Sequence, residues 1–178
     1  MNVLGLHHIT TISSDLQRTH AFYEELLGMR RIMMTSDLDS SGSTHWIWGA
    51  GEGEPGTLIT AFERDPAAES RVRIGVGQTH HFALGVTNAH DQLAFRERLV
   101  QEGLKVSPVM DRLYFKSIYT RDPDGHIVEL ATMGPGFTVD EAAEHLGEKL
   151  MLPPWYETQR AQIEASLRPV RVPLRERA

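Results

Sequence analysis

Two histidine pairs and one glutamate are the residues of this chain whose types and spacing could do chemistry. The pairs, His7-His8 and His80-His81, each open a short run rich in β-branched and aromatic residues. Glu129 stands in an apolar run between Val128 and Leu130, where an unpaired carboxylate would be costly and would need a cation. Two imidazoles and one carboxylate on one side of a metal form a facial triad, which leaves positions open for substrate and dioxygen.

The histidine pairs occupy equivalent positions in an internal repeat. His8 and His81 are 73 residues apart, and the same offset relates the phenylalanines of the helical segments that follow them. One offset that aligns a strand and a helix together indicates two similar half-domains. When the last strands are aligned by their turn glycines, Thr60 lies over Glu129, so only the second half supplies a carboxylate.

Strand alternation indicates which histidine of each pair would face the metal. In an extended segment His8 shares a face with Thr10, and His81 shares a face with two small residues, which leaves room for a ligand cavity. The predicted ligands are therefore His8, His81 and Glu129. This donor set suits Fe(II), Mn(II), Ni(II) or Zn(II), and spacing alone does not choose among them.

Each of these residues also has an ordinary structural interpretation. A strand histidine taken alone is more often a core or surface residue than a ligand, and a buried Glu129 is more often salt-bridged, here to Arg112 or Lys116. The coincidence of two equivalent histidine pairs with a one-sided glutamate favours the metal site. The other histidines are expected to be structural or surface residues: His20, His45, His90, His126 and His145.

The elements that must position these residues follow the order β-α-β-β-β twice, which predicts an α+β fold. The first copy is expected as a strand over 3–12, a helix over 16–27, and strands over 30–35, 44–48 and 57–62. The second is expected as a strand over 79–86, a helix over about 89–101, and strands over about 104–110, 113–120 and 126–132. Residues 63–77 are a charged linker with proline and glycine. We predict two βαβββ modules, about 3–62 and 78–132, paired into one cup-shaped mixed β-barrel.

This domain, residues 1–133, is followed by a different pattern over 134–178. A Thr138-x-x-Glu141 capping box predicts a helix over about 139–150, and a shorter helix is expected over 158–167. We therefore expect a C-terminal helical extension, which either caps the site or makes a contact in a homodimer.

Composition narrows the class of protein. The net charge of −6 argues against a nucleic-acid surface, and 40% hydrophobic residues in 178 can form a real core. The absence of cysteine excludes thiolate metal sites and fits a cytoplasmic location. No apolar run approaches 18 residues and the N-terminus lacks the features of a secretory signal, so no membrane association is expected.

Three motifs resemble the vicinal oxygen chelate superfamily, which includes glyoxalase, bleomycin-resistance and extradiol dioxygenase proteins. They are Leu6-His7-His8-Ile9-Thr10, His80-His81-Phe82-Ala83 and the segment 122–130, and the likeness covers about residues 3–132. A closer likeness, to hydroquinone-type ring-cleaving dioxygenases, rests on the segment 111–119 and on the tail between 134 and 155.

The resemblance implies metal ligation by His8, His81 and Glu129, with Fe(II) as the expected metal and Mn(II) or another divalent ion as the alternative. It also implies roles around a small aromatic substrate for five residues: His7, Thr10, His80, Arg112 and Tyr119. Of these, His7 or His80 is expected to carry protons, Arg112 to hold anionic charge, and Tyr119 either to donate to a substrate oxygen or to serve as a core tyrosine.

The expected activity is insertion of dioxygen into a dihydroxylated aromatic of hydroquinone or catechol type. Members of that subgroup commonly carry four modules, whereas this chain has two, which look like their first and last. We therefore expect that one chain could hold the complete site. The alternatives are glyoxalase-like isomerase or lyase chemistry, thiol transfer, and a metal-free drug-binding protein of the bleomycin-resistance kind with Trp46 and Trp48 in its pocket.

Overall fold

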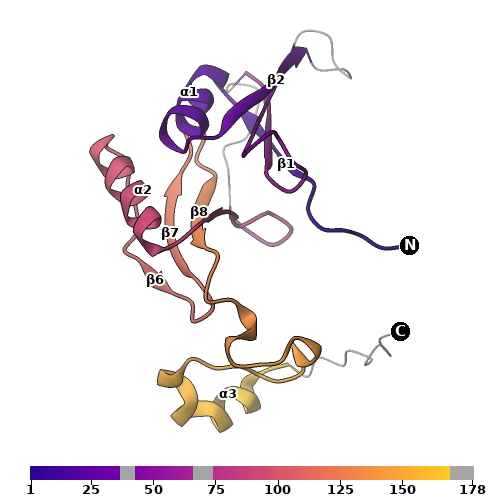
Figure 1. Ribbon diagram of the computed structural model, residues 1–178, viewed down its shortest axis with the longest axis vertical. Coiled ribbons are helices and arrows are strands. Elements are labelled where there is room, and N and C mark those ends of the chain that lie inside the picture. Colours follow the sequence, from indigo (N-terminus) through magenta and orange to yellow (C-terminus); the bar gives the residue numbers. More distant parts are fainter. Residues whose placement is uncertain (37–42, 66–73, 169–178) are drawn as a thin grey trace. The chain divides into compact units, whose positions relative to one another are not determined.

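The chain repeats the order β-α-β-β-β, as predicted, in a computed structural model that describes residues 1–36, 43–65 and 74–168 (Figure 1). The first copy comprises β1 (His8–Ser13), α1 (Leu16–His20), the π-helical segment η1 (Ala21–Leu26), β2 (Arg30–Ser36), β3 (Thr44–Gly49) and β4 (Leu58–Glu63). The second comprises β5 (Phe82–Val86), α2 (Ala89–Gln101), β6 (Met110–Asp111), β7 (Lys116–Arg121) and β8 (Ile127–Thr132). The α+β class and the two modules are therefore confirmed.

Each module forms one four-stranded mixed sheet, and the two sheets have the same topology. The strand orders are β1-β4-β3-β2 and β5-β8-β7-β6, so the first and last strands of a module are parallel neighbours. Thr10 pairs with Thr60 in the first sheet, and Ala83 pairs with Glu129 in the second. Because Thr10 and Ala83 each stand two residues after the second histidine of a pair, this register confirms that Thr60 and Glu129 are equivalent.

Local sequence signals define the helix ends. Asp15 accepts hydrogen bonds from the backbone N–H groups of Gln17 (2.8 Å) and Arg18 (3.1 Å), and Asn88 accepts one from Asp91 (2.9 Å). Such side-chain caps satisfy N–H groups that have no partner within the helix. After η1 the chain turns at Gly28, whose φ of +75° lies in the left-handed region that glycine adopts without strain.

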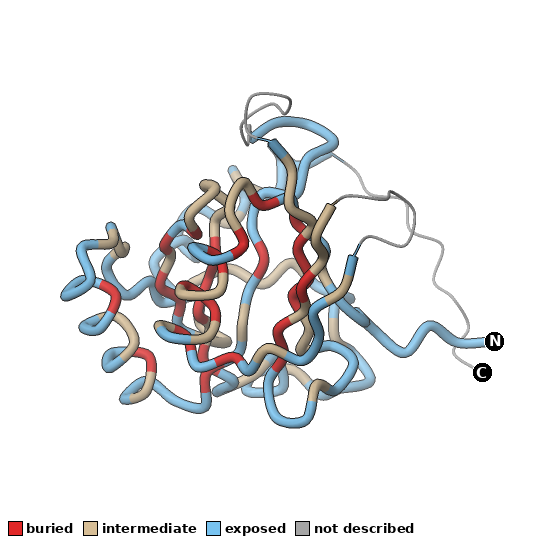
Figure 2. The backbone as a smooth tube through the Cα atoms, turned by 90° about the horizontal axis from the view of Figure 1, so that it is seen from above, coloured by how far each residue is buried: buried red, intermediate tan, exposed pale blue. Residues whose placement is uncertain are grey.

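The core lies between the sheets and the helices that pack on one face of each. In the first module Trp48, Tyr23, Leu16 and Ile59 are almost fully buried. The corresponding buried residues of the second module are Leu99, Ile118, Val128 and Leu130. Figure 2 shows the buried stretches of the strands and helices gathered in the interior. The helices thus cover one face of each sheet, and the other face carries His8 in the first sheet and Glu129, with His81 beside it, in the second.

The two modules contact each other through the start of the first helix and the turn between β7 and β8. The backbone N–H of Ser14 donates to both carboxylate oxygens of Asp124 at 3.2 Å, and the hydroxyl of Tyr23 donates to Asp122 at 3.3 Å. A further hydrogen bond between the modules joins α2 to η1: the Arg98 guanidinium donates to the carbonyl of Leu26 at 3.2 Å. These polar contacts therefore join the first module both to the β7–β8 turn and to helix α2 of the second module.

Several predicted strands are shorter than expected. The strand predicted over 79–86 begins only at Phe82, and the one predicted over about 104–110 is reduced to Met110–Asp111. β7 begins at Lys116 rather than 113 because Leu113 has φ +70° in a tight turn, in which its N–H donates to the Asp111 carboxylate at 2.8 Å. A residue whose backbone dihedral angles lie in the left-handed region cannot continue an extended strand.

The described residues after Gly136, which are residues 137–168, belong to a separate compact unit. Its described elements are three 3₁₀ segments, η2 (Phe137–Val139), η3 (Ala143–His145) and η4 (Pro154–Gln159), followed by α3 (Arg160–Ser166). The helix predicted over about 139–150 was wrong, because Ala142 has an extended backbone and Gly147 has φ +83°, so both interrupt helical geometry. The second predicted helix is present over a shorter range.

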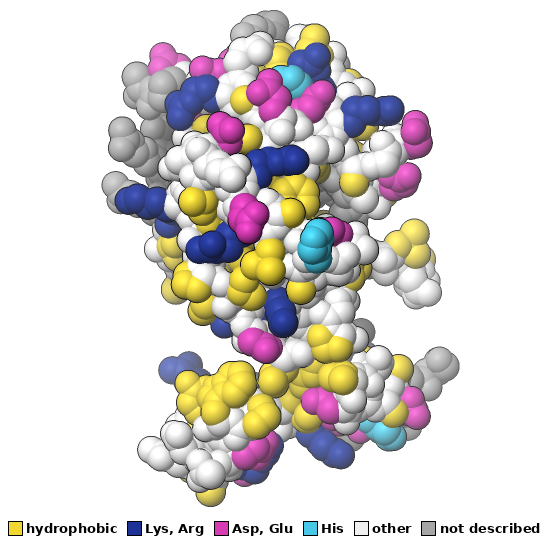
Figure 3. Space-filling view, turned by 60° about the vertical axis from the view of Figure 1, so that its left-hand side comes forward, with side chains coloured by type: hydrophobic (Ala, Val, Ile, Leu, Met, Phe, Trp, Pro, Cys, Tyr) yellow, Lys and Arg dark blue, Asp and Glu magenta, His cyan; other side chains and the backbone are white. Residues whose placement is uncertain are grey.

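The face of the molecule drawn in Figure 3 is mixed in character. Figure 3 shows cationic, anionic and apolar side chains interspersed on the face it presents, without a continuous patch of one charge sign. Within the described ranges, no helix has both the length and the apolar character needed to cross a membrane.

Candidate metal site

His81 and Glu129 come together on the face of the second sheet that the helix does not cover. Nε2 of His81 lies 2.9 Å from Oε2 of Glu129. The glutamate side chain is 4% exposed and the histidine side chain 35% exposed, so a buried carboxylate meets an imidazole at the edge of solvent. Ala83, two residues after His81, is the β5 partner of Glu129, and its small side chain leaves room for the contact.

Ser117 fixes the other oxygen of this carboxylate. Its hydroxyl donates a short hydrogen bond to Oε1 of Glu129 from the neighbouring strand β7, and Ser117 is fully buried. The contacts of Glu129 are therefore with Ser117 and His81, not with Arg112 or Lys116 as the ordinary interpretation expected. No sequence pattern gave Ser117 a role; the available signal was its place two residues before Tyr119 on the same strand face.

His80 contacts the second ring nitrogen of His81. The two Nδ1 atoms are 2.8 Å apart, so one of them donates a proton to the other. When Nδ1–H of His81 is the donor, its Nε2 presents a lone pair toward the Glu129 carboxylate. Two such acceptors repel each other, and a cation bound to both removes the repulsion. The pair can therefore serve as two ligands of a divalent metal, with His80 setting the tautomer of the ligand.

The histidine pair of the first module has nearly the same geometry. His7 and His8 contact through Nδ1 atoms 3.0 Å apart, with ring centroids at 5.2 Å and an interplanar angle of 88°. The corresponding centroid distance and angle for His80 and His81 are 5.1 Å and 86°. Instead of a carboxylate, however, this module has the Thr60 hydroxyl, which donates to the hydroxyl of Thr10 at 3.0 Å.

One chain does not bring all three predicted ligands together. Within residues 1–36, 43–65 and 74–168, no three side chains of histidine, cysteine, aspartate or glutamate are grouped so that they could hold a metal ion. His81 and Glu129 are adjacent, and His8 lies apart from them. The expectation that one chain holds the complete site is therefore not met in this structure.

Tyr119 and Arg112 extend the site beside His81. The Tyr119 ring stands edge-on to the His81 ring, with centroids 5.7 Å apart and an interplanar angle of 88°. The Arg112 guanidinium donates to the Tyr119 hydroxyl at 3.3 Å, and its central carbon lies 5.7 Å from the ring centroid. A phenol and a guanidinium thus lie next to the potential ligands, as a site for an anionic aromatic requires.

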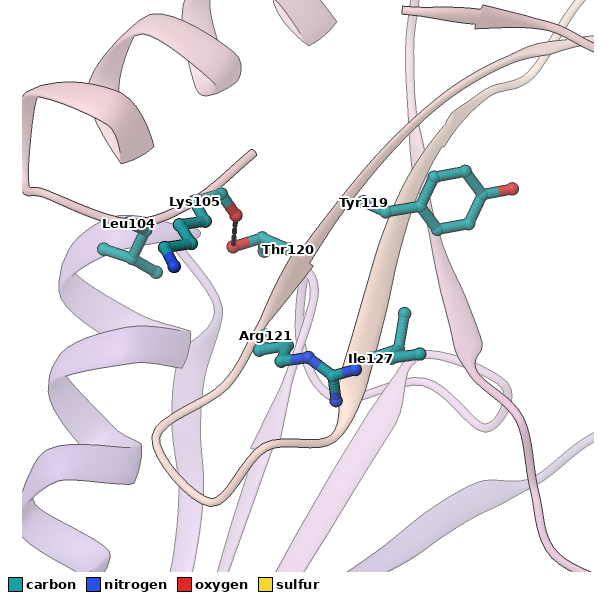
Figure 4. Close-up of a pocket in the computed structure, with 6 residues that line it drawn as sticks. All are labelled: Leu104, Lys105, Tyr119, Thr120, Arg121 and Ile127. Atoms are coloured by element: carbon teal, nitrogen blue, oxygen red, sulfur yellow. Dashed lines mark hydrogen bonds between the residues drawn. The ribbon is translucent and has the colours of Figure 1, made fainter. Parts of the chain in front are cut away.

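Tyr119 also borders an open pocket of about 410 Å³ at the far end of β7. Figure 4 shows Tyr119 and Thr120 pointing to opposite sides of this strand, and the Thr120 hydroxyl donates to the Lys105 carbonyl at 3.1 Å. The pocket is lined by Leu104, Lys105, Tyr119, Thr120, Arg121 and Ile127. Tyr119 is the only residue of this lining that belongs to the predicted site. We therefore do not assign this pocket to the substrate.

His126 has a structural role, as expected. Its Nδ1 lies 2.9 Å from Oδ2 of Asp122, the buried carboxylate that also accepts from Tyr23. The hydrogen bond to Asp122 raises the pKa of His126. Burial, reinforced by the charge of Asp122, raises the pKa of the Tyr23 phenol. This network belongs to the contact between the modules.

The two tryptophans do not line a binding pocket. Trp46 and Trp48 share a strand face, as predicted, but that face is the core: they are 7% and 0% exposed. Trp48 donates through its indole N–H to Nδ1 of His20 at 3.2 Å. The feature on which a metal-free drug-binding pocket would depend is therefore part of the core.

Comparison with known proteins supports the assignment of the repeated module. A model of the Glyoxalase/Bleomycin resistance protein/Dioxygenase superfamily matches residues 5–130. Two similar proteins of Bacillus subtilis strain 168 carry the names "Putative ring-cleaving dioxygenase MhqA" and "MhqO". The chain is 40% identical to MhqA over an alignment that covers 70% of this chain and 39% of MhqA. It is 34% identical to MhqO over an alignment that covers 96% of this chain and 51% of MhqO. This chain thus spans about half the length of MhqO and less than half the length of MhqA.

Among solved structures, the fosfomycin resistance protein FosX of Listeria monocytogenes shares the fold. A point mutant of FosX, solved with Mn(II) and 1S,2S-dihydroxypropylphosphonic acid, aligns with a TM-score of 0.55 and 26% identity. The alignment covers 72% of this chain and 92% of the FosX chain. The aligned part of this chain is thus comparable in extent to almost the whole FosX chain.

Proposed function

The chain belongs to the Glyoxalase/Bleomycin resistance protein/Dioxygenase superfamily, and from this premise we propose that it is a metal-dependent ring-cleaving dioxygenase for dihydroxylated aromatics of hydroquinone or catechol type. The observation that carries the proposal is the contact of His81 with the buried carboxylate of Glu129, held by Ser117 and His80. With His8 as the third ligand, these residues form the two-histidine, one-carboxylate set that non-haem Fe(II) oxygenases use.

The donor set fits Fe(II), with Mn(II) or another divalent ion as the alternative. The side chain of Glu129 is almost fully buried, where a carboxylate needs a positively charged partner. The adjacent imidazole nitrogen of His81 is a common ligand of these divalent metals. When bound there, the metal would lower the pKa of a substrate hydroxyl and bring dioxygen and substrate together. MhqA and MhqO are named as ring-cleaving dioxygenases, which supports this chemistry for the present chain.

Arg112 and Tyr119 are proposed to bind the substrate. The guanidinium donates to the phenol oxygen, so this oxygen is already an acceptor and its own proton can point elsewhere. The hydroxyl can then donate to an anionic substrate oxygen, while the guanidinium contributes positive charge close by. Thr10, which accepts from Thr60, is the corresponding polar contact from the first module.

His80 is proposed to move protons at the site. It contacts Nδ1 of His81 at 2.8 Å and is exposed, so it can exchange protons with water and with a substrate at the metal. Histidine is the side chain that most often serves as a general acid or base. His7 stands in the same relation to His8 and is the equivalent candidate in the first module.

The test is metal content followed by oxygen uptake. Protein purified without oxygen and reconstituted with Fe(II) or Mn(II) should bind one ion per chain and consume dioxygen only with hydroquinones or catechols. Glu129→Gln should lose the metal. Glu148→Gln is the matched control: Glu148 contacts His145 at 3.0 Å within the C-terminal unit and is not a proposed ligand, so its replacement should leave metal content unchanged.

Two other results would redirect the assignment. Bound metal without oxygen uptake would indicate isomerase or lyase chemistry of the glyoxalase kind, although neutral Thr60 at the equivalent position argues against a four-ligand site. A chain that binds no metal even after reconstitution would contradict the proposed dioxygenase and leave a metal-free binding protein.

A further inference from the structure

Met133 lies at the end of the sheet face that carries Glu129. Its backbone N–H donates to the carbonyl of Val86 at 3.1 Å, which extends the parallel pairing of β8 with β5 by one residue. Because side chains alternate along a strand, Glu129, Ala131 and Met133 point to the same face of the second sheet. The Met133 side chain therefore stands on the face that the helix leaves uncovered, which we call the open face.

The Met133 side chain folds back over the open face. A Cβ built on Gly85 would lie 2.8 Å from the Met133 sulfur, so the thioether rests directly on this glycine. Gly85 pairs with Ala131, and Ala83, the residue before it on the same face, pairs with Glu129. The sequence predicted that the two small residues of β5 leave room for a ligand. The structure shows that the thioether fills part of this room.

The two sides of Glu129 differ in chemical character. On the β7 side stands its strand partner Tyr119, whose phenol oxygen accepts from the Arg112 guanidinium at 3.3 Å. On the β5 side, past the proposed histidine ligand, stand the methyl group of Ala83 and the thioether of Met133. A dihydroxylated ring bound over Glu129 would therefore direct its oxygens toward the polar side and a carbon edge toward the thioether.

Met133 is exposed although it lies against the sheet. One side of the thioether contacts Gly85, and the residue as a whole is 72% exposed. A large apolar side chain that faces solvent beside a proposed active site is stabilised when an apolar ligand covers it. Methionine suits this role, because its thioether is polarizable and makes favourable contacts with the edges of aromatic rings. Met133 is therefore placed to contact the edge of a bound ring.

We propose that Met133 is a specificity-determining residue, whose thioether limits the size of the ring substituent on the side of the substrate opposite Tyr119. The preferred substrates are then hydroquinones or catechols that carry hydrogen or a small apolar group, such as methyl, on that edge. A carboxylate there would lose its hydration against an apolar thioether, so it is disfavoured. This inference rests on the proposed function, because it names the substrate class of the same site.

A series of substrates of graded size tests this role. The wild type, loaded with the metal that supports oxygen uptake, should use hydroquinone and methylhydroquinone and discriminate against tert-butylhydroquinone. In Met133→Ala the ratio of kcat/KM between hydroquinone and tert-butylhydroquinone should fall about 10-fold, as is typical when an apolar pocket gains room for a substituent. Calorimetric titration without oxygen should show the same change in the ratio of Kd values. Met133→Leu has a similar volume and should keep the discrimination of the wild type.

Gly85→Ala tests the same wall from the side of the sheet. The Gly85 backbone lies outside the left-handed region, so alanine can adopt it, but the added methyl group would displace the flexible end of Met133 into the space above the sheet. Discrimination against tert-butylhydroquinone should therefore rise rather than fall. The double variant with Met133→Ala has no sulfur to displace and should behave like Met133→Ala alone. Equal effects of Gly85→Ala with and without Met133 would show that the thioether is not the wall.

Failure of this inference is distinguishable from failure of the proposed function. Met34→Ala is the matched control: Met34 is also exposed (56%), but it pairs with the core-facing Trp46 in the first sheet, so its loss should leave the ratio unchanged. Unchanged discrimination in a Met133→Ala variant that folds by circular dichroism and holds its metal would overturn the inference and leave the dioxygenase assignment intact. A wild type that neither binds nor oxidises any hydroquinone or catechol contradicts both.

Discussion

Ser117 holds the carboxylate of Glu129 from the neighbouring strand: its hydroxyl donates to Oε1, while Oε2 faces His81 at 2.9 Å. Both residues are buried, and they share one face of the second sheet. The hydroxyl therefore sets the direction in which the carboxylate presents its second oxygen. A ligand that is aimed before the metal arrives binds it more tightly.

Ser117→Ala is expected to weaken divalent-metal affinity by about 10–100-fold, the typical cost of losing an outer hydrogen bond to a ligand. The measurement is competition between the metal-free variant and a coloured chelator for Mn(II) or Zn(II). Ser166→Ala is the control, because that hydroxyl donates only to a carbonyl in the C-terminal helix. Equal affinities for the wild type and Ser117→Ala would remove Ser117 from the site.

Tyr119→Phe should separate metal binding from substrate binding. The variant keeps the ring against His81 and loses only the hydroxyl that accepts from Arg112. A hydrogen bond to a charged group contributes about 1.5–3 kcal/mol, so kcat/KM on the best hydroquinone should fall about 10–100-fold. Metal content should not change. If kcat/KM is also unchanged, Tyr119 is a structural tyrosine, the other role that the sequence allowed.

Much of the fold could be predicted from sequence because the repeat makes each module a check on the other. The common offset of His8 and His81 located both first strands, and the turn glycines placed Thr60 over Glu129, which the register confirms. Strand ends were less predictable. β7 is shorter than predicted because the backbone at Leu113 is left-handed. Leucine rarely adopts this conformation, so no local sequence pattern indicates it.

The C-terminal prediction failed for a different reason. The capping box at Thr138 and Glu141 is a local signal, but Gly147 and the extended backbone at Ala142 interrupt the segment it was meant to start. In the site, sequence identified the ligand types and missed Ser117, because a serine in a strand has no distinctive pattern. Sequence also could not show that His8 lies apart from His81, since this depends on how the modules pack.

Tyr23→Phe tests the contact between the modules. The phenol is buried and donates to Asp122 at 3.3 Å, so its removal leaves a buried carboxylate with one donor fewer. The free energy of unfolding in urea should fall by about 1 kcal/mol, with an unchanged slope against denaturant. Tyr156→Phe is the control: Tyr156 is 46% exposed and its replacement should stay within about 0.5 kcal/mol. Equal effects of the two changes would contradict a stabilising role for this hydrogen bond.

His126 should make the stability of the fold depend on pH. The hydrogen bond to Asp122 raises its pKa in the folded chain above the value of about 6.5 expected in the unfolded chain. The folded state therefore binds this proton more tightly, so the contribution is fully present below pH about 6.5 and is lost as pH rises through the folded pKa.

The stability advantage of the wild type over His126→Gln should be largest near pH about 5.5 and should shrink toward pH about 8. It shrinks because His126 loses its proton as the pH rises. Chemical denaturation at several pH values measures the difference, and a proton NMR titration of the His126 ring should give a pKa above the ordinary histidine value. His90→Gln is the matched control, because the His90 side chain is 92% exposed. An advantage that stays constant or grows with pH would mean that the folded chain holds His126 neutral, and that Asp122 is stabilised by Tyr23 and the turn N–H groups instead.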